Sequence, residues 1–239
     1  MNEPLTVIFF SCRRLQMLIE TVQSFIHFNK YPLYEFIIVN DSADEKIHRE
    51  LEKTFENVTF VFNKENVGLM KSIDIGYKYI DTGYFFHAED DWKLTAPGFI
   101  EKSMALMKAR PEIEEVWPQL YNIHDAEPEV LNAGGVYYRL VTMFHLKGQD
   151  GPYGWHGFST AFSLKRLSDY KKVGEYCKVP FVGNIWQREQ AIGEQYRLLG
   201  YRTAVITDSK GTVQNYATNI GYGESEYKFG TESDGRKDK

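Results

Sequence analysis

Residues 85–92 read FFHAEDDW, an apolar run that ends in three consecutive acids, Glu89, Asp90 and Asp91. The apolar part is typical of a buried strand. Three adjacent carboxylates repel one another, so such a block must hold a counter-charge or lie wholly in solvent. Which alternative applies depends on where this strand lies in the fold.

Strands and helices alternate along the first part of the chain. Short apolar runs at 5–10, 36–39 and 58–62 predict three buried strands, and residues 83–88 predict a fourth. Between the strands, apolar residues recur at spacings of three and four, as on one face of a helix. We therefore predict a single-domain α/β fold with a mostly parallel central sheet and helices on both faces.

Polar clusters follow three of these strands. They are Ser11–Arg14 after the first strand, Asn40–Ser42 after the second and Glu89–Asp91 after the fourth. Ligands of such sheets bind beyond the carboxyl ends of the strands. The three clusters are therefore expected to meet at one edge of the sheet and to form a ligand site there.

The second half of the chain is less regular. Its pattern predicts a helix from Pro97 to about Arg110, strands at 116–120, 159–164 and 201–206, an irregular strand or hairpin at 133–147, and a helix at about 184–199. Residues 148–157 contain four glycines and one proline, which predicts a mobile loop. We expect one domain over residues 1–221 and a polar tail over 222–239 that is flexible at its end.

Composition excludes several classes of protein. The formal net charge is −5 and the basic residues are scattered, which argues against nucleic acid as a partner. Cys12 and Cys177 are the only cysteines, so neither a disulfide framework nor a zinc site is predicted, and a reducing, cytoplasmic location follows. No run approaches about 18 apolar residues, so no transmembrane segment is predicted.

The acidic block suits a hard divalent cation. Mg²⁺ and Mn²⁺ prefer oxygen ligands and often share them with the phosphates of a substrate. The plain alternative is a solvated acidic turn, which is the usual fate of charge clusters. The position of the block at the ligand-binding edge of the sheet favours the cation.

Four segments together resemble the nucleotide-diphospho-sugar glycosyltransferases of the glycosyltransferase-A fold, and family 2 most of all. They are TVIFFSCRR (6–14), EFIIVNDSAD (35–44), NKENVGLMKSIDIGYKYIDTGYFFHAEDD (63–91) and IWQREQAIGEQYRLLGYR (185–202). The first resembles a strand with its nucleotide-contacting loop, and the third an Asn-Gly helix start followed by the acidic metal motif. The fourth resembles the late helix that carries the family's catalytic carboxylate.

The resemblance implies metal-dependent transfer of a sugar from a nucleoside-diphosphate sugar to an acceptor hydroxyl, with inversion. Asp41 would bind the base of the nucleotide, and Ser11 and Asn66 would lie beside the donor. Asp91, helped by Glu89, would hold Mn²⁺ or Mg²⁺, with Asp90 facing the donor. Glu189 would act as the general base.

Other side chains are assigned from their chemistry. Arg13 and Arg14 follow the first strand and would flank the nucleotide, with a surface position as the alternative for one of them. Lys71 lies one turn into a predicted helix, where it would reach a diphosphate oxygen as a point charge. In the Gly-rich loop, Trp155 and His156 would close over an acceptor sugar, with the indole stacked on its apolar face. Each of these residues has the plainer alternative of a surface or packing role.

The sequence departs from the family pattern at several positions. The first strand is followed by Ser-Cys-Arg-Arg where Thr-Tyr-Asn-Arg is usual, and Glu89 stands where the acidic motif usually opens with Asp. The late pair is Arg188-Glu189 in place of Glu-Asp. No histidine follows His156, so the family's late histidine ligand has no counterpart.

Glu189 also stands out without the family. It shares one helical stripe with Ile185, Ile192, Tyr196 and Leu199. A carboxylate on an apolar face needs a partner or a cavity, and burial would raise its pKa toward that of a useful base. The alternative is a slightly rotated helix with Glu189 at its wet margin.

Two other functions are consistent with parts of the pattern. A sugar-nucleotide or glycan binding module without turnover would accommodate the departure at Arg188. A sugar-nucleotide pyrophosphorylase would require a Gly-rich loop after the first strand, and Ser11–Arg14 contains no glycine.

Overall fold

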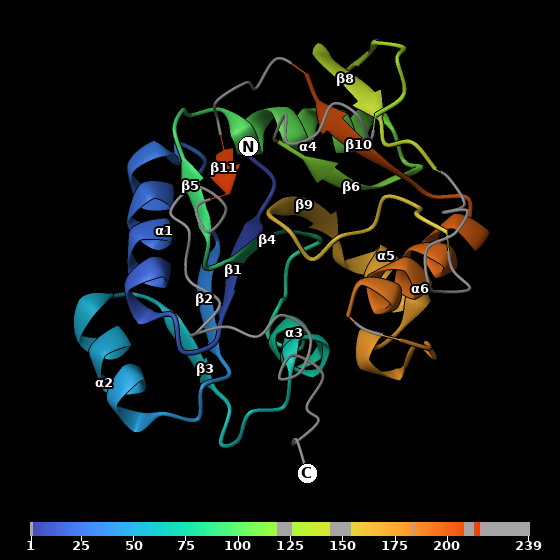
Figure 1. The fold of residues 1–239 in the computed structure, drawn as a ribbon. Coiled ribbons are helices and arrows are strands. Elements are labelled where there is room, and N and C mark those ends of the chain that lie inside the picture. The colour runs from blue at the N-terminus through green and yellow to red at the C-terminus, as the bar shows by residue number, and fades with distance from the viewer. Residues whose placement is uncertain (1, 119–125, 144–153, 184, 208–212, 216–239) are drawn as a thin grey trace.

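The computed structural model of the protein describes residues 2–118, 126–143, 154–183, 185–207 and 213–215. Within them, a nine-stranded sheet has the strand order β3-β2-β1-β4-β9-β6-β10-β8-β7, and β5 and β11 form a separate pair (Figure 1). The predicted tail at 222–239 and most of the predicted loop at 148–157 lie outside the described residues.

The bounds of the elements follow the sequence pattern most closely in the first half. The strands are β1 (Leu5–Ser11), β2 (Glu35–Asn40), β3 (Thr59–Phe62), β4 (Tyr84–Glu89), β5 (Trp92–Leu94), β6 (Ile113–Trp117), β7 (Leu131–Ala133), β8 (Val136–Leu140), β9 (Ser163–Arg166), β10 (Arg202–Ile206) and β11 (Val213–Asn215). The helices are α1 (Leu15–Phe28), α2 (Glu45–Thr54), α3 (Leu69–Tyr77), α4 (Phe99–Ala109), α5 (Leu167–Val173), α6 (Ile185–Leu198) and the short 3₁₀ helix η2 (Tyr176–Lys178).

The central sheet is mixed but mostly parallel. β3, β2, β1 and β4 run parallel to one another. β9 is antiparallel to both β4 and β6, so β6 and its parallel partner β10 point the same way as β4. Only β9 and β8 run against this direction within the nine strands. The predicted fold class is therefore confirmed.

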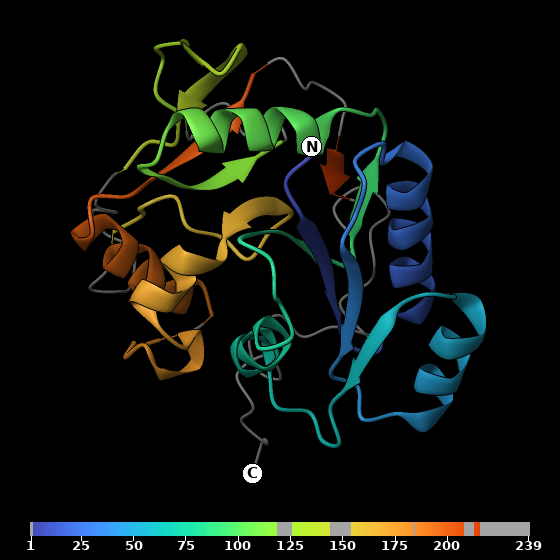
Figure 2. The same ribbon diagram turned by 180° about the vertical axis from the view of Figure 1, so that it is seen from behind.

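Alternation along β1 divides the core between the two faces of the sheet. Val7 and Phe9 pack with α1, α2 and α4, whereas Ile8 and Phe10 pack with α3 and α6. Successive side chains of a strand point to opposite faces, so a continuous apolar run serves a sheet that is covered on both sides. Figure 2 shows the same layers from behind, with α1 and α2 on one flank of the strands and α3 on the other. No helix among the described residues has the length and apolar character needed to cross a lipid bilayer.

The second half differs from the sequence prediction in several places. The short strands β5 and β11 were not predicted, and they pair antiparallel with each other. The predicted strand at 159–164 is mostly loop, and β9 begins at Ser163. The backbone amides of Ser159 and Thr160 donate to side-chain carboxylates of Glu115 and Glu189 and not to a neighbouring strand. The sequence pattern shows the β-propensity of this segment. It does not show that the segment's backbone amides donate hydrogen bonds to carboxylates.

α3 packs unusually close to the sheet at Gly76. A Cβ placed there would lie 2.8 Å from the ring of Phe10 and 2.8 Å from a methyl group of Val39, both buried. Interiors are too densely packed to absorb a contact of that length without moving the helix. Glycine at this position therefore sets how closely α3 approaches β1 and β2.

We predict that Gly76→Ala lowers the free energy of unfolding by about 1–3 kcal/mol, because it overpacks this contact. Gly83→Ala is the matched control, since nothing lies within 4 Å of a Cβ at that position. Urea denaturation of both variants measures the difference. Equal stability of the two variants would contradict the close packing of α3.

Candidate active site

The acidic block closes β4 and is buried. Glu89 is the last residue of β4, and Asp90 and Asp91 form the turn before β5. Asp90 is 0% exposed, Asp91 is buried and Glu89 is partly buried. We call these three residues the acidic corner. Their burial rules out the alternative of a fully solvated turn.

Arg14 supplies the counter-charge that the sequence demanded. Its Nε donates to Asp90 Oδ2 at 3.1 Å and its Nη1 lies 3.4 Å from Asp91 Oδ2, while its Nη2 contacts Asp90 Oδ1. β1 and β4 pair in parallel, with Phe10 opposite Glu89. The segment that follows β1 is therefore delivered directly beside the acidic corner.

One guanidinium does not balance three carboxylates. Burial raises the pKa of Asp90 to about 7 and also raises the pKa values of Glu89 and Asp91, while Arg14 acts in the opposite direction on all three. Asp91 Oδ1 is buried and has no hydrogen-bond partner among the described residues. An unpaired buried carboxylate oxygen beside excess negative charge fits a hard divalent cation that prefers oxygen ligands.

Asp41 lies at the end of the neighbouring strand, β2. Its Oδ1 accepts from Asn63 Nδ2 at 2.8 Å and from the backbone amide of Val67 at 3.0 Å, and its Oδ2 accepts from the amide of Gly68 at 2.9 Å. Burial raises the pKa of Asp41, and these three hydrogen bonds oppose that rise. The carboxylate thus fixes the turn that starts α3.

Ser11 and Asn66 lie against the same strand ends. Asn66 Nδ2 donates to the carbonyl of Asp41 at 2.9 Å and to Cys12 Sγ at 3.2 Å. Ser11 Oγ accepts from Asn40 Nδ2 at 2.8 Å, since Ser11 and Asn40 are register partners. The structure therefore brings Ser11, Asp41 and Asn66 together at the strand ends, and their roles toward a nucleotide stay predictions.

Glu189, on α6, is buried and points toward the acidic corner. It is 6% exposed, and its Oε1 accepts from the Thr160 hydroxyl at 2.6 Å and from the Thr160 amide at 2.9 Å. The same hydroxyl lies 3.4 Å from Glu89 Oε1. Burial raises the pKa of Glu189, and the two bonds from Thr160 lower it. The alternative of a wet helix margin is excluded.

Thr160 is the residue that sequence reasoning missed. It lies within a stretch that reads as a strand, and nothing in the spacing of the sequence relates it to Glu89 or Glu189. In the structure it joins the end of β4 to α6 through one hydroxyl. Only the tertiary fold reveals that link.

The remaining predicted residues lie farther from these contacts. Arg13 is exposed and has a positive φ of 65°, and Lys71 is partly buried on α3. Trp155 packs on Trp117 with a ring-centroid distance of 6.3 Å. His156 is buried, and its Nε2 lies 2.7 Å from Glu194 Oε2 on α6. The roles of these four residues therefore stay predictions.

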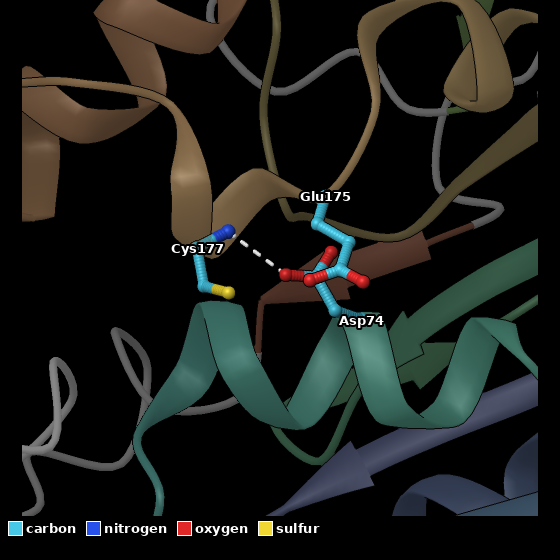
Figure 3. A group of neighbouring side chains, drawn as sticks. All are labelled: Asp74, Glu175 and Cys177. Carbon is cyan, nitrogen blue, oxygen red and sulfur yellow. Dashed lines mark hydrogen bonds between the residues drawn. The ribbon is translucent and has the colours of Figure 1, made fainter.

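A second group of possible ligands, Asp74, Glu175 and Cys177, lies where α3 meets η2 (Figure 3). Asp74 accepts from the backbone amides of Tyr176 and Cys177, each at 2.8 Å, and from the Tyr170 hydroxyl at 2.9 Å. Glu175 pairs with Lys178 at 3.1 Å. These bonds account for Asp74 as a clamp between α3 and η2, without any cation.

Comparison with known proteins places the chain in a family. The sequence model of the family described as "Glycosyl transferase family 2" matches residues 6–174, which is more than half of the chain. That span includes β1 to α5 and with them the acidic corner, Asp41 and Thr160. No curated protein matches the chain in sequence.

Several solved structures share the fold. The mannosyltransferase PcManGT from Pyrobaculum calidifontis, in complex with GDP-Man and Mn²⁺, has a TM-score of 0.60 at 16% identity over 88% of this chain and 56% of its own. GalNAc-T7 with UDP, GalNAc and Mn²⁺ has a TM-score of 0.60 at 14% identity over 88% of this chain and 42% of its own. TarS from S. aureus has a TM-score of 0.54 at 14% identity over 86% of this chain and 35% of its own. The chain thus spans little more than half, or less, of each of these proteins.

We predict that Arg14→Met lowers the free energy of unfolding by about 3–5 kcal/mol at a pH high enough for Asp90 to be charged, because it leaves a buried carboxylate uncompensated. Removing the guanidinium raises the pKa of Asp90 further, so the folded state binds a proton more tightly than the unfolded state. The penalty is therefore present at high pH and fades as pH falls through that raised pKa.

Chemical denaturation at pH 5 and pH 8 measures this effect. Arg13→Met is the control, because the exposed neighbour should change stability by no more than about 0.5 kcal/mol. Equal losses in the two variants, or a loss at Arg14 that grows in acid, would contradict the assignment of Arg14 as the counter-charge.

Proposed function

Because the chain belongs to glycosyl transferase family 2, we propose that it is a metal-dependent, inverting glycosyltransferase that uses a nucleoside-diphosphate sugar. The observation that carries the proposal is the meeting of Glu189 with the acidic corner through Thr160. A candidate base and a candidate metal site from distant parts of the sequence share one hydroxyl. Transfer to an acceptor beside a bound diphosphate needs the base and the metal site held close to each other.

The donor side of the site is formed by β1, β2 and β4. Asp91 and Glu89 would hold Mn²⁺ or Mg²⁺, and the unpartnered Asp91 Oδ1 supports this choice. A bound cation would neutralise the negative charge that develops on the leaving diphosphate. Asp41, Ser11 and Asn66 would border the nucleotide, and Asp90 would face the donor while held by Arg14.

Two basic side chains complete the proposed donor side. Arg13 is exposed beside the end of β1 and would flank the nucleotide, and Lys71, on α3, would reach a diphosphate oxygen. The charge of Lys71 also lowers the pKa of Cys177, against the larger effect of burial, which raises it.

The acceptor side is formed by α6 and the segment around Thr160. The acceptor oxygen would attack the anomeric carbon as the bond from that carbon to the diphosphate breaks, and the hydroxyl proton would pass to Glu189. Both hydrogen bonds from Thr160 go to Oε1 of Glu189. Among the described residues, Oε2 is therefore the oxygen that would take the proton. A single displacement of this kind inverts the anomeric configuration.

Trp155 and His156 are the residues proposed for the acceptor. Trp155 would offer an aromatic face to an acceptor sugar. His156 would help to place it from the side of Glu194. Arg188, the departure from the family's acidic pair, lies with its guanidinium 4.0 Å from the centre of the Phe181 ring, which gives this arginine a packing role. The free thiols of Cys12 and Cys177 suit the proposed cytoplasmic location.

We predict that Mn²⁺ together with a nucleoside diphosphate raises the melting temperature, and that Asp91→Asn loses most of this shift. Ligand at about 100 times its dissociation constant stabilises a protein by about 2.7 kcal/mol. Glu175→Gln is the control, since it removes an acid of the second group and should keep the full shift. A shift that survives in Asp91→Asn and disappears in Glu175→Gln would place the cation at the wrong group for transfer.

We predict that Glu189→Gln lowers kcat for transfer by about 10²–10⁴-fold, the usual contribution of a general base. Donor binding, followed by the thermal shift, should be retained because Glu189 does not touch the proposed metal ligands in the described contacts. For the wild type, the rate should fall in acid at a pH above the ordinary range of a glutamate, since burial raises the pKa of Glu189.

The same assay separates the alternatives. Undiminished transfer by Glu189→Gln would remove the assigned base. Donor binding without turnover in both proteins would indicate a binding module in place of an enzyme.

A further inference from the structure

We propose that Thr160 and the buried ion pair of Lys165 with Glu115 are positioning residues for the transfer step. They fix the segment of residues 158–162, called here the Thr160 loop, so that Glu189 is held facing the acceptor. The inference rests on the function proposed above. It adds Thr160, which donates to the carboxylate of Glu189, and Lys165 and Glu115, which hold the Thr160 loop.

The Thr160 loop is held by carboxylates on both sides. The amide of Ser159 donates to Glu115 Oε2 at 3.2 Å, and the next amide, that of Thr160, donates to Glu189 Oε1 at 2.9 Å. The carbonyl of Ser159 accepts from Lys165 Nζ at 3.0 Å. Two consecutive peptide groups are therefore anchored to β6, β9 and α6, which leaves the Thr160 hydroxyl little freedom to move.

The ion pair that anchors the loop is almost completely dry. Lys165 Nζ lies 2.8 Å from Glu115 Oε2, and the two side chains are 4% and 0% exposed. They face each other because Glu115 and Lys165 are register partners of β6 and β9. Glu115 Oε1 accepts from Trp117 Nε1 at 2.8 Å, and Lys165 Nζ lies 4.6 Å from the centre of the Phe158 ring. Every polar group of the pair is thus engaged.

A buried pair of this kind is a poor way to gain stability. The cost of removing two charges from water often exceeds their attraction, and apolar residues of similar volume stabilise a core as well or better. Here the pair binds both the amide and the carbonyl of Ser159, which apolar side chains would leave without partners. A gain in stability does not explain the desolvation cost of this ion pair. A role in holding the Thr160 loop in one conformation does explain it.

The same pair acts on the charge of Glu189. The groups that influence this carboxylate include Thr160, Glu115 on β6 and Lys165 on β9, and Glu189 in turn raises the pKa of Glu89 on β4. Burial raises the pKa of Glu189 most, Glu115 raises it further, and Lys165 lowers it. Lys165 therefore helps to keep the base deprotonated while it fixes the base's hydrogen-bond donor.

The Thr160 hydroxyl is the final link. Thr160→Val keeps the shape of the side chain and removes the hydroxyl, and misplacement of a reacting group can cost about 100-fold in rate. We expect kcat to fall by about 10- to 100-fold, with the donor-dependent thermal shift and donor KM unchanged. Thr160→Ser keeps the hydroxyl and should recover most of the rate.

Lys165→Met tests the ion pair. We expect a similar loss of kcat and, in addition, a shift of the acid limb of the pH–rate profile to higher pH, because a cation that lowers the pKa of Glu189 is lost. Asp169→Asn is the matched control. Asp169 is a buried carboxylate that accepts a hydrogen bond from the Tyr201 hydroxyl and pairs with Arg166, the residue that follows Lys165 in the sequence. Among the described residues it has no contact with the Thr160 loop. It should lose stability without any change in kcat or pH profile.

The outcomes separate this inference from the function on which it rests. Wild-type kcat in Thr160→Val, beside an inactive Glu189→Gln, overturns the positioning role and leaves the proposed function intact. Undiminished transfer in Glu189→Gln overturns the proposed function itself. If Lys165→Met does not fold, the comparison of Thr160→Val with Thr160→Ser decides, because equal losses in both variants would mean that the hydroxyl is irrelevant.

Discussion

The contact of Arg14 with Asp90 and Asp91 is the constraint on which the rest of the site depends. A buried, charged aspartate is very costly without a partner. Among the described residues, the partner of the Asp90 carboxylate is Arg14, in the segment that follows β1. The parallel register of β1 and β4 sets the ends of both strands side by side. Beside that pairing, Asp91 Oδ1 is buried without a hydrogen-bond partner among the described residues, which is why we propose a cation at this edge of the sheet.

The same kind of hydrogen bond occurs at three places around the candidate site. The side-chain carboxylates of Asp41, Glu115 and Glu189 accept hydrogen bonds from backbone amides of irregular segments, namely Val67–Gly68, Ser159 and Thr160. Irregular backbone needs such partners because it forms no ladder of its own. In each case the carboxylate belongs to a regular element, β6 or α6, or directly follows one, β2. Helices and strands thereby fix the positions of the loops that surround the site.

Much of this could be predicted from the sequence, for physical reasons that also explain the limits. The apolar run of β1 requires cover on both faces, and the polar residues at its end must meet those after β4. The helical stripe that Glu189 shares with Ile192 and Tyr196 left burial and a wet margin open as alternatives, and all three residues are buried in the structure. The choice between Arg13 and Arg14 did not follow, because the exposure of Arg13 and the contact of Arg14 with Asp90 are set by the tertiary fold. Thr160 and Lys165 act through tertiary contacts that leave no periodic trace in the chain.

The central claim is that the acidic corner holds a divalent cation on the diphosphate of a donor. A crystal structure of the protein with Mn²⁺ and a nucleoside diphosphate, with the metal located by its anomalous scattering, tests it most directly. The account predicts manganese within coordination distance of Asp91 and of the diphosphate, with Arg14 still on Asp90. Manganese at Asp74 and Glu175, or a diphosphate bound away from the ends of β1 and β4, would contradict it.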